Sequence, residues 1–425
     1  MARTLAPATG KSDARAADDM HAPILGMNPA MNRIFCVVLF VSIGSSIITP
    51  MLGPIIFSDA GFFPSATNSD RMVAYSYVMA VYALGMIFGN PLWGALSDRL
   101  GRRSAFIISL TAGIFGLAFS LASIIYAAFF LFILGRWIDG LMAGRRTIAL
   151  SMLSSASTDK LATFRKTEIL NASGLLLGPL LGGMMVPSGD HLPLHHYGAP
   201  LVLMLALTII NIFLVPRQEY PTAHAAVERP PSILALLRSN KSITLYLTFF
   251  LFQIGWHLFF LSLLPYAVIH YKFTPFQLGL FSTAQVLIYI LILLVLSPRL
   301  KRKTSEGLYA ESALFIGIIS LLAIWSSGNK LMVFALASAA MISATAIVIP
   351  IFSKHISELG HGSHDGATIG VQNGIIGCAW LLAALSNGFM TQNAPLHAFL
   401  LAAACFFSVA IILRLYAVKR HLFHF

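Results

Sequence analysis

Long apolar runs separated by short polar turns make up most of this chain. Runs such as 34–57 and 241–269 exceed the roughly 18 to 20 residues that cross a bilayer as a helix. They lack the alternation over about 10 residues that strands of a membrane barrel show. Because backbone polar groups in lipid must be paired within their own segment, the runs predict helices. We count twelve spans, at approximately 34–57, 71–96, 104–125, 127–153, 166–187, 200–215, 242–269, 276–297, 308–326, 331–352, 366–389 and 395–417.

The polar segments arrange these spans as two groups of six. Residues 1–30 hold six charged residues and no apolar core, which predicts a polar tail and not a cleaved signal peptide. The longest polar segment between two spans is 216–240, and its prolines are typical of a linker. The predicted fold is an all-α membrane protein of two pseudo-symmetric six-helix bundles, divided into a tail over 1–32, a first bundle over 33–215, a central cytoplasmic loop over 216–240, a second bundle over 241–418 and a tail over 419–425.

Composition supports the membrane assignment. Hydrophobic residues make up 57% of the 425 and charged residues 10%, whereas soluble domains carry about 25% charge. The three cysteines, Cys36, Cys378 and Cys405, fall inside apolar spans, so neither a disulfide framework nor a metal site is expected. No hydrolase, kinase or redox motif is present, and we predict no cofactor.

The net charge of +12 follows the topology. If the amino terminus is cytoplasmic, the outer loops hold only Arg71, Lys272 and Lys330 as basic residues, which matches the positive-inside rule. We therefore expect both termini in the cytoplasm and the protein in a bacterial inner membrane. The basic clusters are short and adjoin spans, so no nucleic-acid partner is expected.

Short segments recur at matching positions in the two halves. TPMLGPIIF in the first span is echoed by LLPYAVIHY in the seventh, and SDRLGRR after the second span by SPRLKRK after the eighth. Such internal similarity is typical of a duplicated transporter.

The turn between the second and third spans, 89–106 (GNPLWGALSDRLGRRSAF), concentrates charge between apolar runs. Its glycines permit close backbone approach, its arginines hold the turn at the inner surface, and Asp98 can accept from a helix amino terminus or pair with an arginine. A hairpin that only sets topology would explain the arginines but not the residue order. That order resembles the loop signature of the major facilitator superfamily. The matching residues are Gly94, Leu96, Asp98, Arg99, Gly101, Arg102 and Arg103.

The resemblance covers about residues 30–418 and implies the twelve-span fold of that family. It also implies that the turn is a gating loop, which locks the cytoplasmic ends of the two halves together in the outward-open state and releases them as the halves rock.

The fifth span carries a face of small residues. Glycines at four-residue spacing let helices approach closely in lipid, and an adjacent proline bends the helix. Generic packing would also produce such a stripe. The full order of small residues resembles the antiporter signature of the superfamily's drug:proton exporters. In those proteins the signature seals the fifth span against its neighbours and limits leak. The matching residues here are Gly174, Gly178, Pro179, Gly182 and Gly183.

The fourth span carries charge at bilayer depth. Arg136 and Asp139 are three residues apart and Arg146 follows Asp139 by seven, so all three can share one helical face. Arg136, Gly140 and Ala143 resemble the family's fourth-span motif, whose arginine is implicated in proton coupling. Asp139 departs from that motif, because a glutamine is usual there.

Asp139 is the only acid near the centre of any span, and the first span has none, although many exporters of the resembled group place one there. A buried carboxylate whose partners change can bind and release a proton. We therefore expect Asp139 and Arg136 to couple transport to protons, with His257 as the other candidate. A permanent Arg136–Asp139 pair and a structural, hydrogen-bonded His257 remain alternatives.

Polar side chains in central parts of the spans are the candidates for the substrate cavity, although each alone could be an interhelical hydrogen bond. Arg136, Arg145 and Arg146 outnumber the single central acid, so a cavity beside them would favour anions over lipophilic cations. The candidates are Arg146, Gln253, His257, Gln285, Tyr289, Gln372 and Asn373. An outer segment with Asp190, His191, His195 and His196 is expected to be a solvated loop and not a metal site.

These features predict a secondary active transporter that exports a small amphipathic or anionic molecule, such as a drug, a siderophore or another metabolite, in exchange for protons. An importer or uniporter on the same fold is the alternative, and a non-transporting enzyme or scaffold is a remote one. The expected partners are a small-molecule substrate, protons and the lipid bilayer, with the monomer as the functional unit.

Overall fold

The computed structural model describes residues 29–156, 160–187, 194–217, 240–296, 306–328, 330–358, 365–390 and 396–418. Most of the predicted amino-terminal tail, most of the central loop and all of the carboxyl-terminal tail lie outside these ranges. The described part contains helices and no strand. The first half consists of α2 (Pro29–Ile47), α3 (Thr49–Phe57), α4 (Asn68–Leu100), α5 (Arg102–Tyr126), α6 (Phe129–Leu141), the 3-10 turn η1 (Met142–Gly144), α7 (Arg145–Ala156), α8 (Lys160–Met185), the 3-10 turn η2 (Leu194–Gly198) and α9 (Ala199–Leu214). The second half consists of α11 (Asn240–Tyr271), α12 (Pro275–Leu296), α13 (Glu306–Trp325), α14 (Leu331–Glu358), α15 (Asp365–Met390) and α16 (His397–Val418).

The all-helical, multi-span fold predicted from the apolar runs is confirmed. Eleven segments in the described ranges are long and apolar enough to cross a membrane. The twelfth expected span, 127–153, is the pair α6 and α7, which η1 interrupts. Each piece is too short to span alone, and its charged residues lower its hydropathy. The span that carries charge at bilayer depth is therefore interrupted near its middle.

The first expected span is also divided, into α2 and α3. Pro50 stands in the first turn of α3, where its missing N–H cannot continue the hydrogen-bond ladder of α2. The break falls at Ile48, inside the predicted run 34–57.

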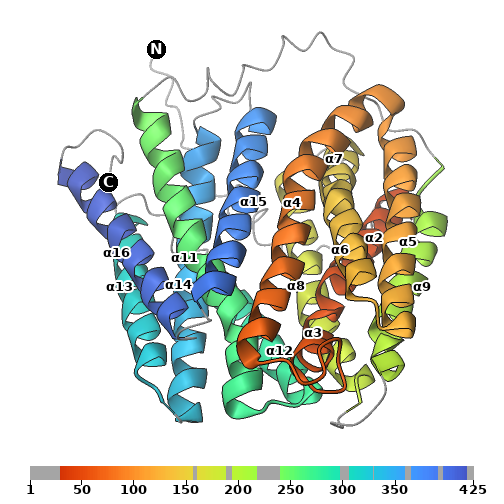
Figure 1. Cartoon of the computed structure of the whole chain (residues 1–425). Coiled ribbons are helices and arrows are strands. Elements are labelled where there is room, and N and C mark those ends of the chain that lie inside the picture. The colour runs from red at the N-terminus through yellow and green to blue at the C-terminus, as the bar shows by residue number, and fades with distance from the viewer. Residues whose placement is uncertain are drawn as a thin grey trace, which may run out of the picture.

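The helices run back and forth, so α2 begins and α16 ends at the same end of the molecule, here called the termini end (Figure 1, top). The opposite end, called the far end, carries the connection 58–67. Helices α2 to α9 pack mainly among themselves, as do α11 and α13 to α16. The two bundles meet along α4 and α15 and along α8 and α12 (Figure 1).

A buried arginine closes the connection at the far end of the first bundle. Arg71 Nη1 donates to the Phe57 carbonyl at 2.7 Å, and its Nη2 donates to the Phe63 carbonyl at 3.0 Å. The same guanidinium binds the Asp59 carboxylate. It thereby satisfies the Phe57 carbonyl, which the end of α3 leaves without an intrahelical partner, and ties the connection back to it through the Phe63 carbonyl.

Candidate functional site

The charged fourth span is held against α4 by glycines. A Cβ added at Gly85 would lie 2.6 Å from the Trp137 carbonyl oxygen, and one at Gly140 would lie 3.0 Å from the Tyr82 carbonyl carbon. Only residues without a side chain permit this backbone contact. Trp93 Nε1 donates to the Leu141 carbonyl at 2.8 Å, next to the break at η1. The end of α6 is therefore fixed in position.

Asp139 lies between two arginines. Arg136 Nη1 donates to Asp139 Oδ2 at 2.8 Å, and Arg145 Nη2 donates to Asp139 Oδ1 at 2.8 Å. Arg145 Nε also donates to the Met142 carbonyl at 2.8 Å. All three charged side chains are buried, at 9% exposure or less. We call Arg136, Asp139 and Arg145 the charge triad, and it carries a net single positive charge.

The pairing differs from the sequence expectation, which placed Arg146 on the face of Asp139. Arg146 Nη2 instead donates to Glu168 Oε1 at 2.6 Å, in an ion pair in which both side chains are exposed. A 3-10 turn advances about 120° per residue and an α-helix about 100°, so η1 rotates the residues that follow it. The rotation moves Arg145 toward the face of Asp139 and Arg146 past it, and Glu168 on α8 then binds Arg146. The continuous helix assumed from the spacing was wrong.

Aromatic rings connect the charge triad to the second bundle. The guanidinium carbon of Arg136 lies 4.3 Å from the centroid of the Tyr82 ring on α4. The Tyr82 ring is 5.7 Å from Trp380 on α15, and Trp380 is 5.1 Å from His257 on α11. We call Tyr82, Trp380 and His257 the aromatic bridge. The three proton-coupling candidates, Asp139, Arg136 and His257, therefore belong to one continuous set of contacts.

Sequence reasoning missed Tyr82, Trp380 and the role of Arg145. Aromatic residues are common in these spans, and nothing local marks Tyr82 and Trp380 as neighbours. The adjacent arginines Arg145 and Arg146 are evident in the sequence, but helical spacing predicted that Arg146, and not Arg145, lies beside Asp139.

The other candidates for the substrate cavity have varied surroundings. Gln253, His257 and Gln285 are buried, and His257 Nδ1 donates to the Gln253 carbonyl at 2.7 Å. Gln372 Nε2 donates to Ser353 Oγ at 2.8 Å, which is an interhelical hydrogen bond within the second bundle. Tyr289 and Asn373 are half-buried.

The glycine face of the fifth span has two contacting sides. A Cβ at Gly174 would lie 2.8 Å from the Leu39 carbonyl oxygen and one at Gly178 would lie 2.7 Å from that of Ile43, both on α2; Gly182 likewise meets the Ile47 carbonyl. These three glycines therefore pack the fifth span within its own bundle.

Gly183 faces the other bundle. A Cβ there would lie 2.8 Å from the Pro275 carbonyl oxygen and 3.0 Å from the Gly279 Cα, both on α12. The Pro179 carbonyl also meets Gly279, and Thr283 Oγ1 donates to the Leu176 carbonyl at 3.1 Å. Sequence reasoning missed Gly279 and Thr283, although their four-residue spacing is the signal of a small-residue contact face.

The predicted gating loop is described only in part. Gly101, between α4 and α5, has φ of +84°, a conformation that favours glycine. Arg103 Nε donates to the Pro216 carbonyl at 2.9 Å, at the start of the central loop. The side chains of Asp98 and Arg99 and the surroundings of Gly94 lie outside the described part, so the latch stays a prediction.

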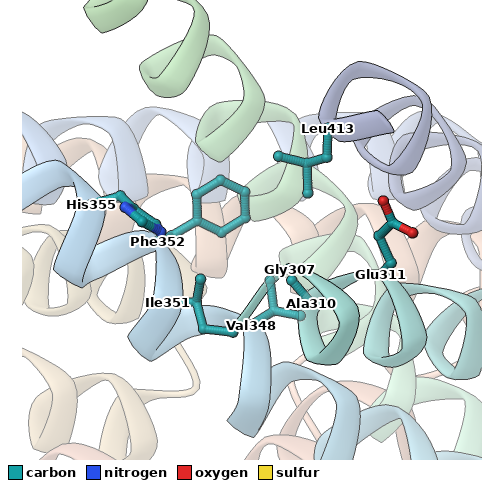
Figure 2. A pocket seen from close by; sticks show the side chains of 8 residues that line it. All are labelled: Gly307, Ala310, Glu311, Val348, Ile351, Phe352, His355 and Leu413. Carbon is teal, nitrogen blue, oxygen red and sulfur yellow. The ribbon is translucent and has the colours of Figure 1, made fainter. Parts of the chain in front are cut away.

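A separate hollow lies at the termini end of the second bundle, between α13, α14 and α16 (Figure 2). Glu311 and His355 stand on opposite sides of it, and the rest of its wall is apolar. Glu311 Oε2 accepts from Arg414 Nη1 at 3.4 Å. This hollow includes no residue of the charge triad or the aromatic bridge.

The outer histidine segment is also described in part. Asp190 and His191 lie outside the described residues, and His195 and His196 are exposed with ring centroids 4.3 Å apart. The described residues contain no group of three or more His, Cys, Asp or Glu side chains that could hold a metal ion.

Comparisons with known proteins agree with this architecture. The family described as Major Facilitator Superfamily matches residues 34–341. The class D tetracycline resistance protein of Salmonella ordonez is 27% identical over 170 residues, which cover 39% of this chain and 41% of that protein. The first match thus spans less than half of that relative's length. The quinolone resistance protein NorA of Staphylococcus aureus strain MSSA476 is 23% identical over 309 residues, which cover 71% of this chain and 75% of that protein.

Two solved structures share the fold over nearly their whole length. The human organic anion transporter MFSD10 aligns with a TM-score of 0.67 at 19% identity, covering 91% of this chain and 99% of that one. A D-xylose-proton symporter aligns with a TM-score of 0.73 at 15% identity, covering 91% of this chain and 96% of that one.

Proposed function

Because the chain belongs to the major facilitator superfamily, we propose that it exports small amphipathic or anionic molecules in exchange for protons, by alternating access. Its family makes it a multi-pass membrane transporter of small molecules and not an enzyme. We propose a bacterial inner membrane as its location, and the distribution of Lys and Arg supports an orientation with the termini end in the cytoplasm. The monomer is the proposed functional unit, with one six-helix bundle before and one after the central loop.

The charge triad is the observation that supports proton coupling best. Asp139 uses both carboxylate oxygens to hold one arginine of α6 and one of α7. A proton on Asp139 removes its charge and weakens both ion pairs, so Arg145 and the helix that it begins are released. A group that is equally stable in both states cannot drive a transport cycle, whereas a carboxylate with exchangeable partners can.

Export is favoured over import by the glycine face of the fifth span and by two relatives named for resistance to tetracycline and to quinolones. The organic anion transporter with the same fold agrees with an anionic substrate. The D-xylose-proton symporter shares the fold as well, so proton-coupled import is the second candidate.

The test uses inside-out membrane vesicles with an acidic interior. Wild-type protein should accumulate a fluorescent quinolone or tetracycline in these vesicles, and Asp139→Asn should abolish accumulation while retaining ligand binding. In detergent, ligand should release protons from wild-type protein but not from Asp139→Asn. Glu168→Gln is the matched control, because Glu168 also pairs with an arginine but is exposed.

Two outcomes would overturn the proposal. Accumulation in right-side-out vesicles only would make the protein an importer. Wild-type accumulation by Asp139→Asn, with its proton dependence intact, would remove Asp139 as the carrier and leave His257 as the next residue to test. Comparing metabolites in the medium of deletion and overexpressing cells would identify a native substrate such as a siderophore.

A further inference from the structure

Three buried polar atoms along the aromatic bridge have no hydrogen-bond partner within the described residues. They are Arg136 Nε, Trp380 Nε1 and Gln253 Oε1. Leaving a buried donor or acceptor without a partner costs free energy, so such groups in a native protein require an explanation. A ligand that supplies the missing partners is one explanation with a defined chemistry.

These atoms are distributed along one path through the middle of the molecule. Arg136 lies over the Tyr82 ring at the first-bundle end, and Trp380 follows in the centre. Gln253 is one helical turn from His257 at the second-bundle end, and its carbonyl accepts from His257 Nδ1. The path therefore offers one donor in the charge triad, one donor at its centre on Trp380 and one acceptor on α11, with aromatic rings between them.

The charge of this region selects the sign of the ligand. The charge triad holds two guanidinium groups and one carboxylate, all buried, so one positive charge is not neutralised within it. Buried charge is weakly screened, so it repels a cation and attracts an anion. Aromatic rings prefer to pack against other rings in stacked or edge-to-face arrangements.

We propose that the aromatic bridge is a recognition site for a planar aromatic monoanion. The aromatic ring of the ligand packs among Tyr82, Trp380 and His257. Its carboxylate accepts hydrogen bonds from Trp380 Nε1 and Arg136 Nε, and a hydroxyl or amino group at its other edge donates to Gln253 Oε1. The inference rests on the proposed function, because it names the substrate class of the same transport site.

The test measures binding directly, by equilibrium dialysis of the purified full-length protein in detergent. The probes are 2-naphthoate, 2-naphthylmethylammonium and cyclohexanecarboxylate, which separate the effects of charge and aromaticity. Wild-type protein should bind 2-naphthoate at least tenfold more tightly than either of the other probes. Equal binding of the cation, or no binding of 2-naphthoate, would overturn the inference.

Two variants separate the hydrogen bond from the ring contact. Trp380→Phe keeps a ring and should weaken 2-naphthoate binding about tenfold, since it removes a hydrogen bond to a charged group. Trp380→Leu should weaken binding by roughly a further two- to tenfold. Trp325→Leu on α13 is the control, because Trp325 is exposed on the outside of the bundle.

Unchanged 2-naphthoate affinity in folded Trp380→Phe would refute the site. Thermal unfolding of each variant establishes that it is folded before binding is compared. Because binding is measured without transport, 2-naphthoate that binds but is not moved would contradict the proposed function and leave the recognition site standing.

Discussion

At the scale of single residues, the chain concentrates its electrostatics in the charge triad. A buried ion pair gains little overall, but removing one partner leaves an uncompensated buried charge, which typically costs about 3–5 kcal/mol. Arg145 and Arg146 are adjacent in the sequence, yet one pairs with a buried carboxylate and the other with an exposed one. The same substitution at these two positions should therefore have very different effects.

We predict that Arg145→Gln lowers the free energy of unfolding by about 1.5–3 kcal/mol, because Asp139 loses one charge-assisted hydrogen bond but keeps Arg136 as its counter-ion. Arg146→Gln should change it by about 0–1 kcal/mol, as expected of an exposed pair. Unfolding of both variants in detergent checks this. Adding Asp139→Asn to Arg145→Gln should lower the free energy of unfolding further, because Arg136 then lacks a buried counter-ion. Equal effects at the two arginines would contradict the assignment.

At the scale of elements, α8 uses two sides of one motif for two different contacts. Gly174 and Gly178 pack α8 on α2 within its own bundle, whereas Gly183 contacts Gly279 on α12 of the other bundle. Contacts within a bundle should support the fold. Contacts between bundles should control how the two bundles move relative to each other.

Gly279→Ala tests the second role. The added Cβ would meet the Pro179 carbonyl and lie 3.1 Å from the Gly183 Cα, so α8 and α12 cannot approach as closely. We expect transport to fall at least tenfold while thermal unfolding of the protein changes little. Gly374→Ala on α15 is the matched control, because a Cβ there meets nothing within 4 Å. Wild-type transport by Gly279→Ala would mean that this crossing does not limit the cycle.

At the scale of the whole molecule, the described bundles touch near the far end. Gly388 on α15 faces Ser76 on α4, and Gly53 on α3 faces Leu278 on α12. Alternating access requires such contacts to separate in the other state. A covalent link across them should therefore stop transport.

We predict that Ser76→Cys combined with Gly388→Cys forms a disulfide, since a Cβ at Gly388 would start only 2.7 Å from the Ser76 Cβ and small shifts reach disulfide geometry. The native cysteines Cys36, Cys378 and Cys405 are free and must be replaced first. Oxidation should abolish transport and a reductant should restore it. Each single variant is the control, and full transport by the oxidised double variant would show that these segments do not separate.

The sequence by itself determined the helical spans and part of the site. Span positions follow from apolar runs, because each segment's transfer into lipid depends mainly on its own composition. The Arg136–Asp139 contact and the shared face of Gly174, Gly178 and Gly182 could be predicted because residues three and four apart are neighbours on any helix.

Only the tertiary structure decided which distant residues complete the site. Tyr82 and Trp380 come from different bundles, as do Gly183 and Gly279, and no local periodicity relates them. Arg145 pairs with Asp139 in place of Arg146 because η1, packed against α4 through Trp93, changes the winding of the fourth span, and because Glu168 on α8 binds Arg146. Helix packing and local changes of winding depend on the surrounding bundle, so spacing along one segment cannot specify them.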